Sequence, residues 1–178
     1  MVDVFKESAV LMDKKLLTRS ALLLALTLVF QSLRFIIPLP MVFSTLLIGS
    51  LVNSCLLVAV ETIGLSSACI IAIIASIVAY FQQLLPLPLF IGPVAAGNII
   101  YLGVFYLLLR QGRWLAVGLA AICKAGFLYG SFTWLLTLIA IPAKLAAGLM
   151  FAMSWPQLVT GILGGLLAAN VSKRIKLL

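Results

Sequence analysis

Histidine is absent from this sequence of 178 residues, and acidic side chains are rare. The chain has only four acids, which are Asp3, Glu7, Asp13 and Glu61. Only Glu61 adjoins a long apolar run, so the chain offers no carboxylate pair for acid–base catalysis or for a cation cage. The three cysteines form no CxxC pair, and all lie inside apolar runs: Cys55, Cys69 and Cys123. The sequence therefore predicts no metal site, no cofactor and no catalysis by this chain alone.

Charge of either sign is scarce. Charged residues make up 9% of the chain and apolar residues 65%, and the mean hydropathy is +1.30. A soluble domain of this size needs far more polar surface, so these values indicate a chain whose solvent is lipid. Most of the cations behind the net charge of +8 lie between apolar runs, as the positive-inside rule expects. Aromatic and basic residues are not interleaved as in single-strand binders, which argues against a nucleic-acid partner.

Six apolar runs are long enough to cross the hydrocarbon core of about 30 Å, and they predict an all-α integral membrane protein. The six predicted transmembrane helices cover residues 17–37, 41–60, 65–83, 93–109, 114–141 and 145–171. Only ETIG separates the second run from the third, which makes this junction the weakest boundary. We expect a cytoplasmic amino-terminal segment (1–16), one six-helix domain (17–172) and a basic cytoplasmic tail (173–178).

Lysine and arginine favour one orientation of these helices. In the six-helix interpretation, nine cations lie on one side of the membrane: Lys6, Lys14, Lys15, Arg19, Arg110, Arg113, Lys173, Arg174 and Lys176. Arg34 and Lys144 lie towards the other side. Both termini are therefore predicted to be cytoplasmic.

Lys124 stands near the middle of the fifth apolar run, where a cation costs about 3 kcal/mol on insertion scales. Such a residue usually faces a cavity, a partner or a ligand. Glu61 is expected at the cytoplasmic end of the second helix, so an internal pair with Lys124 is doubtful. Arg34 lies about 22 Å along the first helix, which places it in the outer leaflet.

Four further polar or aromatic residues are predicted in the outer half of the membrane: Asn98, Trp134, Trp155 and Gln157. With Arg34 and Lys124 they predict a cationic, partly aromatic pocket that opens outward and contains no carboxylate. Such a pocket suits a small ligand with a carboxylate, a phosphate or carbonyl oxygens on a flat or apolar body. Each residue also has a structural interpretation, because arginine snorkels, tryptophan lines membrane interfaces and amides join helices.

Two pairs of small residues have the spacing of closely packed membrane helices, Ala21 with Ala25 and Gly161 with Gly165. Packing inside the bundle is the ordinary interpretation of the glycine pair. The alanine pair belongs to TRSALLLA, which opens the first predicted helix. Gly97-Asn98 follows in the fourth helix, and SWPQLVT with Gly164-Gly165 follows in the sixth.

These motifs, their order and the six-helix topology resemble the substrate-binding S components of energy-coupling factor (ECF) transporters, the vitamin-uptake systems of prokaryotes. The resemblance covers nearly the whole chain. It implies a multi-pass protein of the prokaryotic plasma membrane that binds a vitamin or related micronutrient near the outer face. It also implies partners, namely a transmembrane coupling protein and two cytoplasmic ATPase subunits. Ala21 and Ala25 would then form the surface that meets the coupling protein.

The resemblance does not name the ligand. The cationic pocket argues against thiamine and mildly favours anionic or carbonyl-rich ligands. Two other classes of protein stay open at this point. One is a stand-alone secondary carrier, and the other is a membrane-embedded accessory subunit or enzyme that acts on a lipid-soluble substrate.

Overall fold

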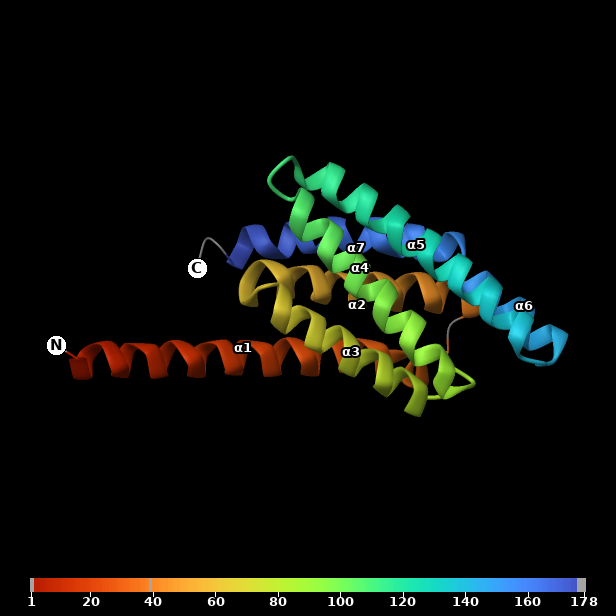
Figure 1. Cartoon of the computed structure of the whole chain (residues 1–178), viewed down its shortest axis with the longest axis horizontal. Coiled ribbons are helices and arrows are strands. Elements are labelled where there is room, and N and C mark those ends of the chain that lie inside the picture. The colour runs from red at the N-terminus through yellow and green to blue at the C-terminus, as the bar shows by residue number, and fades with distance from the viewer. Residues whose placement is uncertain (1, 39, 176–178) are drawn as a thin grey trace.

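The computed structural model describes the backbone of residues 2–38 and 40–175 and the side chains of residues 14–38 and 40–174. All regular structure in this part of the chain is helical. The elements are α1 (Val2–Ile36), α2 (Met41–Ile63), α3 (Leu65–Phe81), the 3-10 helix η1 (Pro88–Phe90), α4 (Ile91–Leu108), α5 (Arg113–Leu138), α6 (Ala143–Ala152) and α7 (Trp155–Ile175). Successive long helices run in alternating directions, so the start of α1 and the end of α7 lie at the same end of the bundle (Figure 1).

Five helical segments of the described chain are long and apolar enough to cross a membrane. They cover Lys14–Ile36, Met41–Ile63, Pro88–Leu108, Arg113–Leu138 and Ala143–Arg174. The remaining apolar helix, α3, has 17 residues. A helix of that length rises only about 25 Å, less than the usual hydrocarbon thickness of about 30 Å. The expectation of an all-helical fold is confirmed for the described residues, and five segments could span a membrane by their length and composition. A sixth span stays a prediction.

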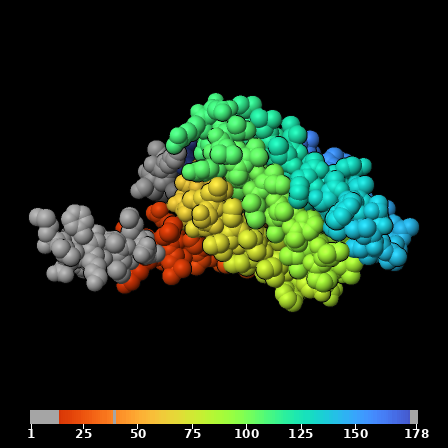
Figure 2. All heavy atoms as spheres, in the orientation of Figure 1, coloured from red at the N-terminus to blue at the C-terminus, as the bar shows by residue number. Residues whose placement is uncertain are grey.

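The outer surface of the bundle is rich in large apolar side chains. Figure 2 shows the face formed by α3, α4 and α5. Exposed residues on these helices include Ile70, Ile73, Ile77, Phe81, Leu107, Ile122 and Trp134. Large apolar side chains exposed along several helices indicate contact with lipid or another apolar partner rather than with water.

The predicted sixth helix is not continuous, which corrects the sequence-based boundary of 145–171. It is divided into α6 and α7 at Met153 and Ser154. Pro156 explains the break, because proline has no N–H to donate to the carbonyl four residues earlier. That carbonyl belongs to Ala152, and the Gln157 side chain takes the missing place through a hydrogen bond from Nε2 at 3.0 Å.

The short junction between α2 and α3 is a single glycine. Gly64 has a φ of +86°, which side chains other than glycine rarely adopt, and it lets the chain reverse between the two helices. The weakest boundary in the sequence is therefore a real turn.

Helix α7 packs closely against its neighbours through glycine. A Cβ atom at Gly165 would lie 2.3 Å from Val117 Cγ1 of α5, and one at Gly161 would lie 2.7 Å from Ala121 Cβ. The spacing of these two glycines predicted packing inside the bundle, and the contacts confirm it. This close packing fills the half of the bundle that contains the end of α7.

Candidate functional site

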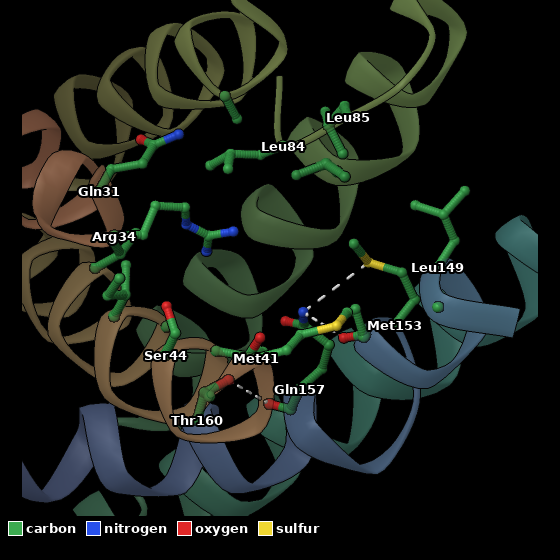
Figure 3. Close-up of a pocket in the computed structure, with 18 of the residues that line it drawn as sticks. Gln31, Arg34, Met41, Ser44, Leu84, Leu85, Leu149, Met153, Gln157 and Thr160 are labelled. Carbon is green, nitrogen blue, oxygen red and sulfur yellow. Dashed lines mark hydrogen bonds between the residues drawn. The ribbon is translucent and has the colours of Figure 1, made fainter. Parts of the chain in front are cut away.

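A cavity of about 930 Å³ opens into the other half of the bundle. Its lining comes from α1 to α7 and from the connection after α3. Along α2 the lining residues recur every three or four positions from Met41 to Asn53. These twelve positions correspond to a depth of about 18 Å. The cavity therefore runs from the end of the bundle where α2 begins to the middle of that helix. Figure 3 shows part of its lining.

The floor of the cavity is a chain of hydrogen bonds around Lys124. Its ammonium donates to Asn53 Oδ1 at 2.7 Å, and Asn53 Nδ2 donates to Thr160 Oγ1 at 3.2 Å. Thr160 in turn donates to the carbonyl of Gln157 at 3.2 Å. The chain joins α5, α2 and α7. Lys124 Nζ also lies 5.2 Å from the centre of the Tyr101 ring, a distance at which an aromatic face attracts a cation.

The side wall contains two further polar contacts. Asn98 Nδ2 approaches Ser76 Oγ at 3.5 Å and so joins α4 to α3. Gln31 Nε2 donates to the carbonyl of Ala75 at 3.2 Å and joins α1 to α3. Gln31 Oε1 is buried and has no hydrogen-bond partner among the described residues. One acceptor is therefore left open on this wall.

The mouth of the cavity is lined by two cations. Arg34 lies in the last turn of α1, and its side chain extends into the cavity beside Gln31 (Figure 3). Arg34 Nε is buried and has no hydrogen-bond partner in the described part of the chain. Lys144, at the start of α6, lines the same end and is exposed. No aspartate or glutamate occurs among the lining residues that the structure describes.

Most of the remaining lining is apolar. The side chains come from α2, α3, α4, α6 and the connections after α3 and α6: Ile48, Val52, Ala75, Ala79, Leu84, Leu85, Val94, Leu149 and Met153. The cavity is thus an apolar chamber with cationic groups at its mouth and at its floor. Such a lining holds the body of a ligand by burial and orients it through a few polar groups.

The structure brings together four of the six residues predicted for the pocket. Arg34, Asn98, Lys124 and Gln157 all line the cavity. Trp134 and Trp155 do not line it, and their exposed fractions are 64% and 50%. Both tryptophans lie on the outside of the bundle, because their helices turn other faces inward. The aromatic wall expected from the sequence is therefore absent from the described lining.

Two important residues were missed by sequence reasoning, Asn53 and Gln31. Each is a polar residue inside an apolar run, and this signal alone was available in the sequence. The direction of each side chain depends on how the helices rotate against one another, which the sequence does not show. Ala21 and Ala25, in contrast, are both exposed on α1, outside the cavity.

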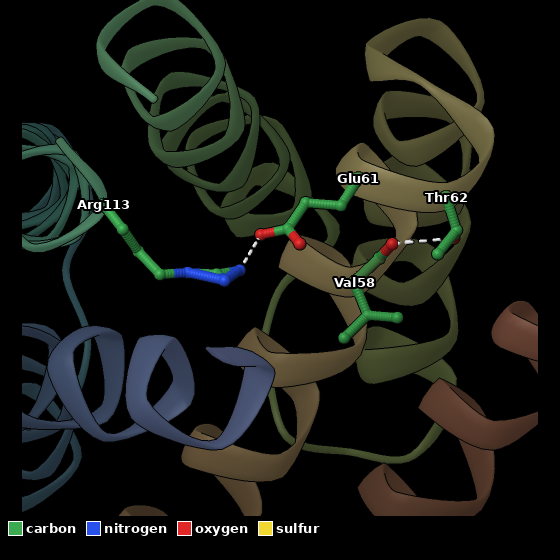
Figure 4. A network of polar contacts seen from close by, with 4 residues as sticks. All are labelled: Val58, Glu61, Thr62 and Arg113. Atoms are coloured by element: carbon green, nitrogen blue, oxygen red, sulfur yellow. Dashed lines mark hydrogen bonds and ion pairs between the residues drawn. The ribbon is translucent and has the colours of Figure 1, made fainter. Parts of the chain in front are cut away.

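Glu61 forms an ion pair with Arg113 at the opposite end of the bundle (Figure 4). The pair joins the end of α2 to the start of α5. The Glu61 side chain is 6% exposed and the Arg113 side chain 24%. Glu61 is thus occupied by Arg113, in agreement with the doubt about a pair between Glu61 and Lys124.

No family model matches the chain, and no curated protein and no solved structure gives a match either. The geometry of the site is therefore the guide to its ligand. A cavity with cations and without carboxylates attracts an anion electrostatically, and its apolar walls favour a ligand with an apolar body.

Proposed function

We propose that this chain is the membrane-embedded substrate-binding subunit of an ECF-type importer. It captures a small, vitamin-like anion at the outer face of a prokaryotic plasma membrane. The observation that carries the proposal is the cavity of about 930 Å³, which has cations and no described carboxylate in its lining. Its size falls in the range of small-molecule and cofactor sites.

The orientation of the chain supports this function. The cavity opens at the end of the bundle opposite to the end of α7. The basic residues Lys14, Lys15, Arg110, Lys173 and Arg174 lie in segments at the end that contains the end of α7. By the positive-inside rule that end is cytoplasmic, and the cavity then faces outward. We place both termini in the cytoplasm and treat α3 as the sixth span.

The docking surface of this subunit is the Ala21–Ala25 face of α1. Both alanines are exposed, and Leu22 beside them is 67% exposed. A pair of small residues at this spacing lets another helix approach closely in a membrane. The expected partners are a transmembrane coupling protein and two ATPase subunits, which supply the ATP hydrolysis.

Copurification tests the proposal directly. The tagged full-length chain, extracted in mild detergent from its native membrane, should bring down a transmembrane protein and two ATPases. Native mass spectrometry of the same sample should show a small bound ligand. Purification without ATPases, together with uptake driven by an ion gradient, would instead establish a stand-alone secondary carrier. Turnover of a lipid-soluble substrate by the chain alone would establish an enzyme.

Docking is tested separately from binding. Ala21→Trp and Ala25→Trp should each abolish uptake and copurification of the ATPases, because a bulky ring prevents close helix approach. Ligand binding and thermal stability of the isolated subunit should not change, since both positions are exposed. Ile70→Trp is the matched control, because Ile70 is 58% exposed on α3. Uptake that survives both alanine substitutions would remove this face from the docking surface.

A further inference from the structure

The cations of the cavity are arranged at two levels. Arg34 and Lys144 lie at the mouth, and Lys124 lies at the floor against Asn53. Arg34 lies in the last turn of α1, at the end of the bundle where α2 begins, and Asn53 stands twelve residues beyond Met41, the first residue of α2. The two cationic levels therefore lie at different depths of a lining that extends about 18 Å along α2.

Neither level has a counter-ion in the described lining. Lys124 is only 4% exposed, and an ammonium has three N–H donors. Its one hydrogen bond goes to a neutral amide oxygen, Asn53 Oδ1. A buried charge with only neutral partners gains strongly from an anion in contact with it. The floor of the cavity therefore favours an anionic group.

Arg34 at the mouth also lacks an anionic partner among the described residues. Arg34 Nε is buried and unpaired among the described residues, although the guanidinium is built to bind oxygen pairs. Arg34 extends into the cavity from α1, one helical turn beyond Gln31 (Figure 3). The lining also includes the apolar side chains of Ile48, Val52 and Ala79, and Ile48 and Val52 stand between Met41 and Asn53 along α2. A ligand with an anionic group at each end and an apolar body matches a lining of this kind.

We propose that the site takes an elongated dianion, with one anionic group at Arg34, an apolar body in the chamber and a second anionic group at Lys124. This inference rests on the proposed binding function and specifies its substrate class. The body lies against the apolar walls, and the open Gln31 Oε1 accepts a hydrogen bond from any donor near the Arg34 end. Capture begins at the mouth, where Lys144 raises the local concentration of anions.

Straight-chain dicarboxylates are the probes that test this arrangement. The purified full-length chain in detergent is titrated by calorimetry with the series from butanedioate to dodecanedioate. Monocarboxylates of the same carbon number serve as matched ligands. Affinity should pass through a maximum with chain length, and the best dicarboxylate should bind at least tenfold more tightly than its monocarboxylate partner.

Variants assign the two ends. Arg34→Gln and Lys124→Gln should each lower the affinity for the best dicarboxylate at least tenfold, to the level of the monocarboxylate. Lys124→Gln keeps an N–H donor on a slightly shorter side chain and removes the charge. Lys173→Gln, in the last turn of α7, is the control and should change nothing. Thermal unfolding without ligand reports folding, and Arg34→Gln at the mouth gives the result if Lys124→Gln does not fold.

Three outcomes would overturn the dianion: equal affinity for dicarboxylates and monocarboxylates, no dependence on chain length, or no binding of either series. If the coupling protein and ATPases copurify with the chain, the importer proposal would stand in each of these three cases. Failure of copurification with a clear length optimum would leave the dianion site standing and overturn the importer.

Discussion

The ammonium of Lys124 donates to Asn53 Oδ1 at 2.7 Å, and this hydrogen bond joins α5 to α2 in the interior of the bundle. The charge therefore has a polar partner but no carboxylate partner among the described side chains. An internal salt bridge would have made Lys124 a structural residue. A lysine held by a neutral amide at the floor of a cavity is instead available to an anionic ligand.

Asn53→Asp should turn this ligand site into an internal ion pair. The new carboxylate lies in place of the amide oxygen and competes with any anionic ligand for Lys124. We expect anion affinity to fall at least tenfold, while the melting temperature of the empty protein stays the same or rises. Calorimetry and thermal unfolding measure the two effects.

Asn53→Ala is the companion variant. The change removes the acceptor of the Lys124 ammonium and the donor to Thr160. It should lower the free energy of unfolding by about 1–3 kcal/mol.

One outcome would contradict the role of Lys124. Equal or tighter anion binding by Asn53→Asp would show that Lys124 does not contact the ligand.

Gly165→Ala should destabilise the bundle despite the higher helix propensity of alanine. The added Cβ would lie 2.3 Å from Val117 Cγ1, and overpacking of this kind costs about 1–3 kcal/mol. Val117→Ala should rescue the variant. Gly118→Ala on α5 is the matched control, because its Cβ would have nothing within 4 Å. Thermal unfolding in detergent compares the unchanged protein, Gly165→Ala, the double variant with Val117→Ala, and Gly118→Ala. Equal melting temperatures of the unchanged protein and Gly165→Ala would contradict close packing at this contact.

Arg113→Met should show how much the end of the bundle opposite the cavity depends on one ion pair. Glu61, with only 6% of its side chain exposed, would lose its cation and be left as an unpaired carboxylate. Because Arg113 is partly exposed, we expect a loss of about 1–3 kcal/mol, below the range for fully buried pairs. Adding Glu61→Gln to Arg113→Met should recover part of the lost free energy of unfolding. Arg110→Gln, an exposed neighbour, should change nothing, and a larger loss in the double variant would contradict the pairing.

Gln157→Leu should loosen the junction between α6 and α7. Gln157 Nε2 donates a hydrogen bond to the Ala152 carbonyl, which receives none from the backbone of Pro156. The substitution therefore leaves this carbonyl without a hydrogen-bond donor. We expect faster proteolysis near Met153 and Ser154 and weaker ligand binding, since α6 forms one wall of the cavity. Pro156→Ala restores a backbone donor, and in that background Gln157→Leu should have a smaller effect. Equal effects in both backgrounds would contradict this role.

The sequence predicts the helical class and most helix boundaries because apolar length and proline act locally. Met41 and Leu65 begin helices as expected, and Gly64 forms the turn that ETIG suggested. The division at Pro156 was not predicted, because proline also occurs in kinked but continuous helices.

The site was predictable only in part. Lys124 and Arg34 are conspicuous in the sequence because cations are rare in apolar runs. Their surroundings depend on helix rotation and on contacts between distant positions, such as Asn53 with Lys124 and Glu61 with Arg113. The same dependence explains why Trp134 and Trp155 lie outside the bundle although their depth matched the predicted pocket.

The tight contacts of Gly161 and Gly165 with α5 adjoin a buried core that includes Leu56, Tyr101 and Val117, beyond the floor of the cavity. Under the proposed function, a solute that enters the cavity would therefore reach a closed end, and an occupied subunit would not dissipate proton or sodium gradients. Delivery would then require the bundle to reorient or to open, with the work supplied by the proposed partner ATPases.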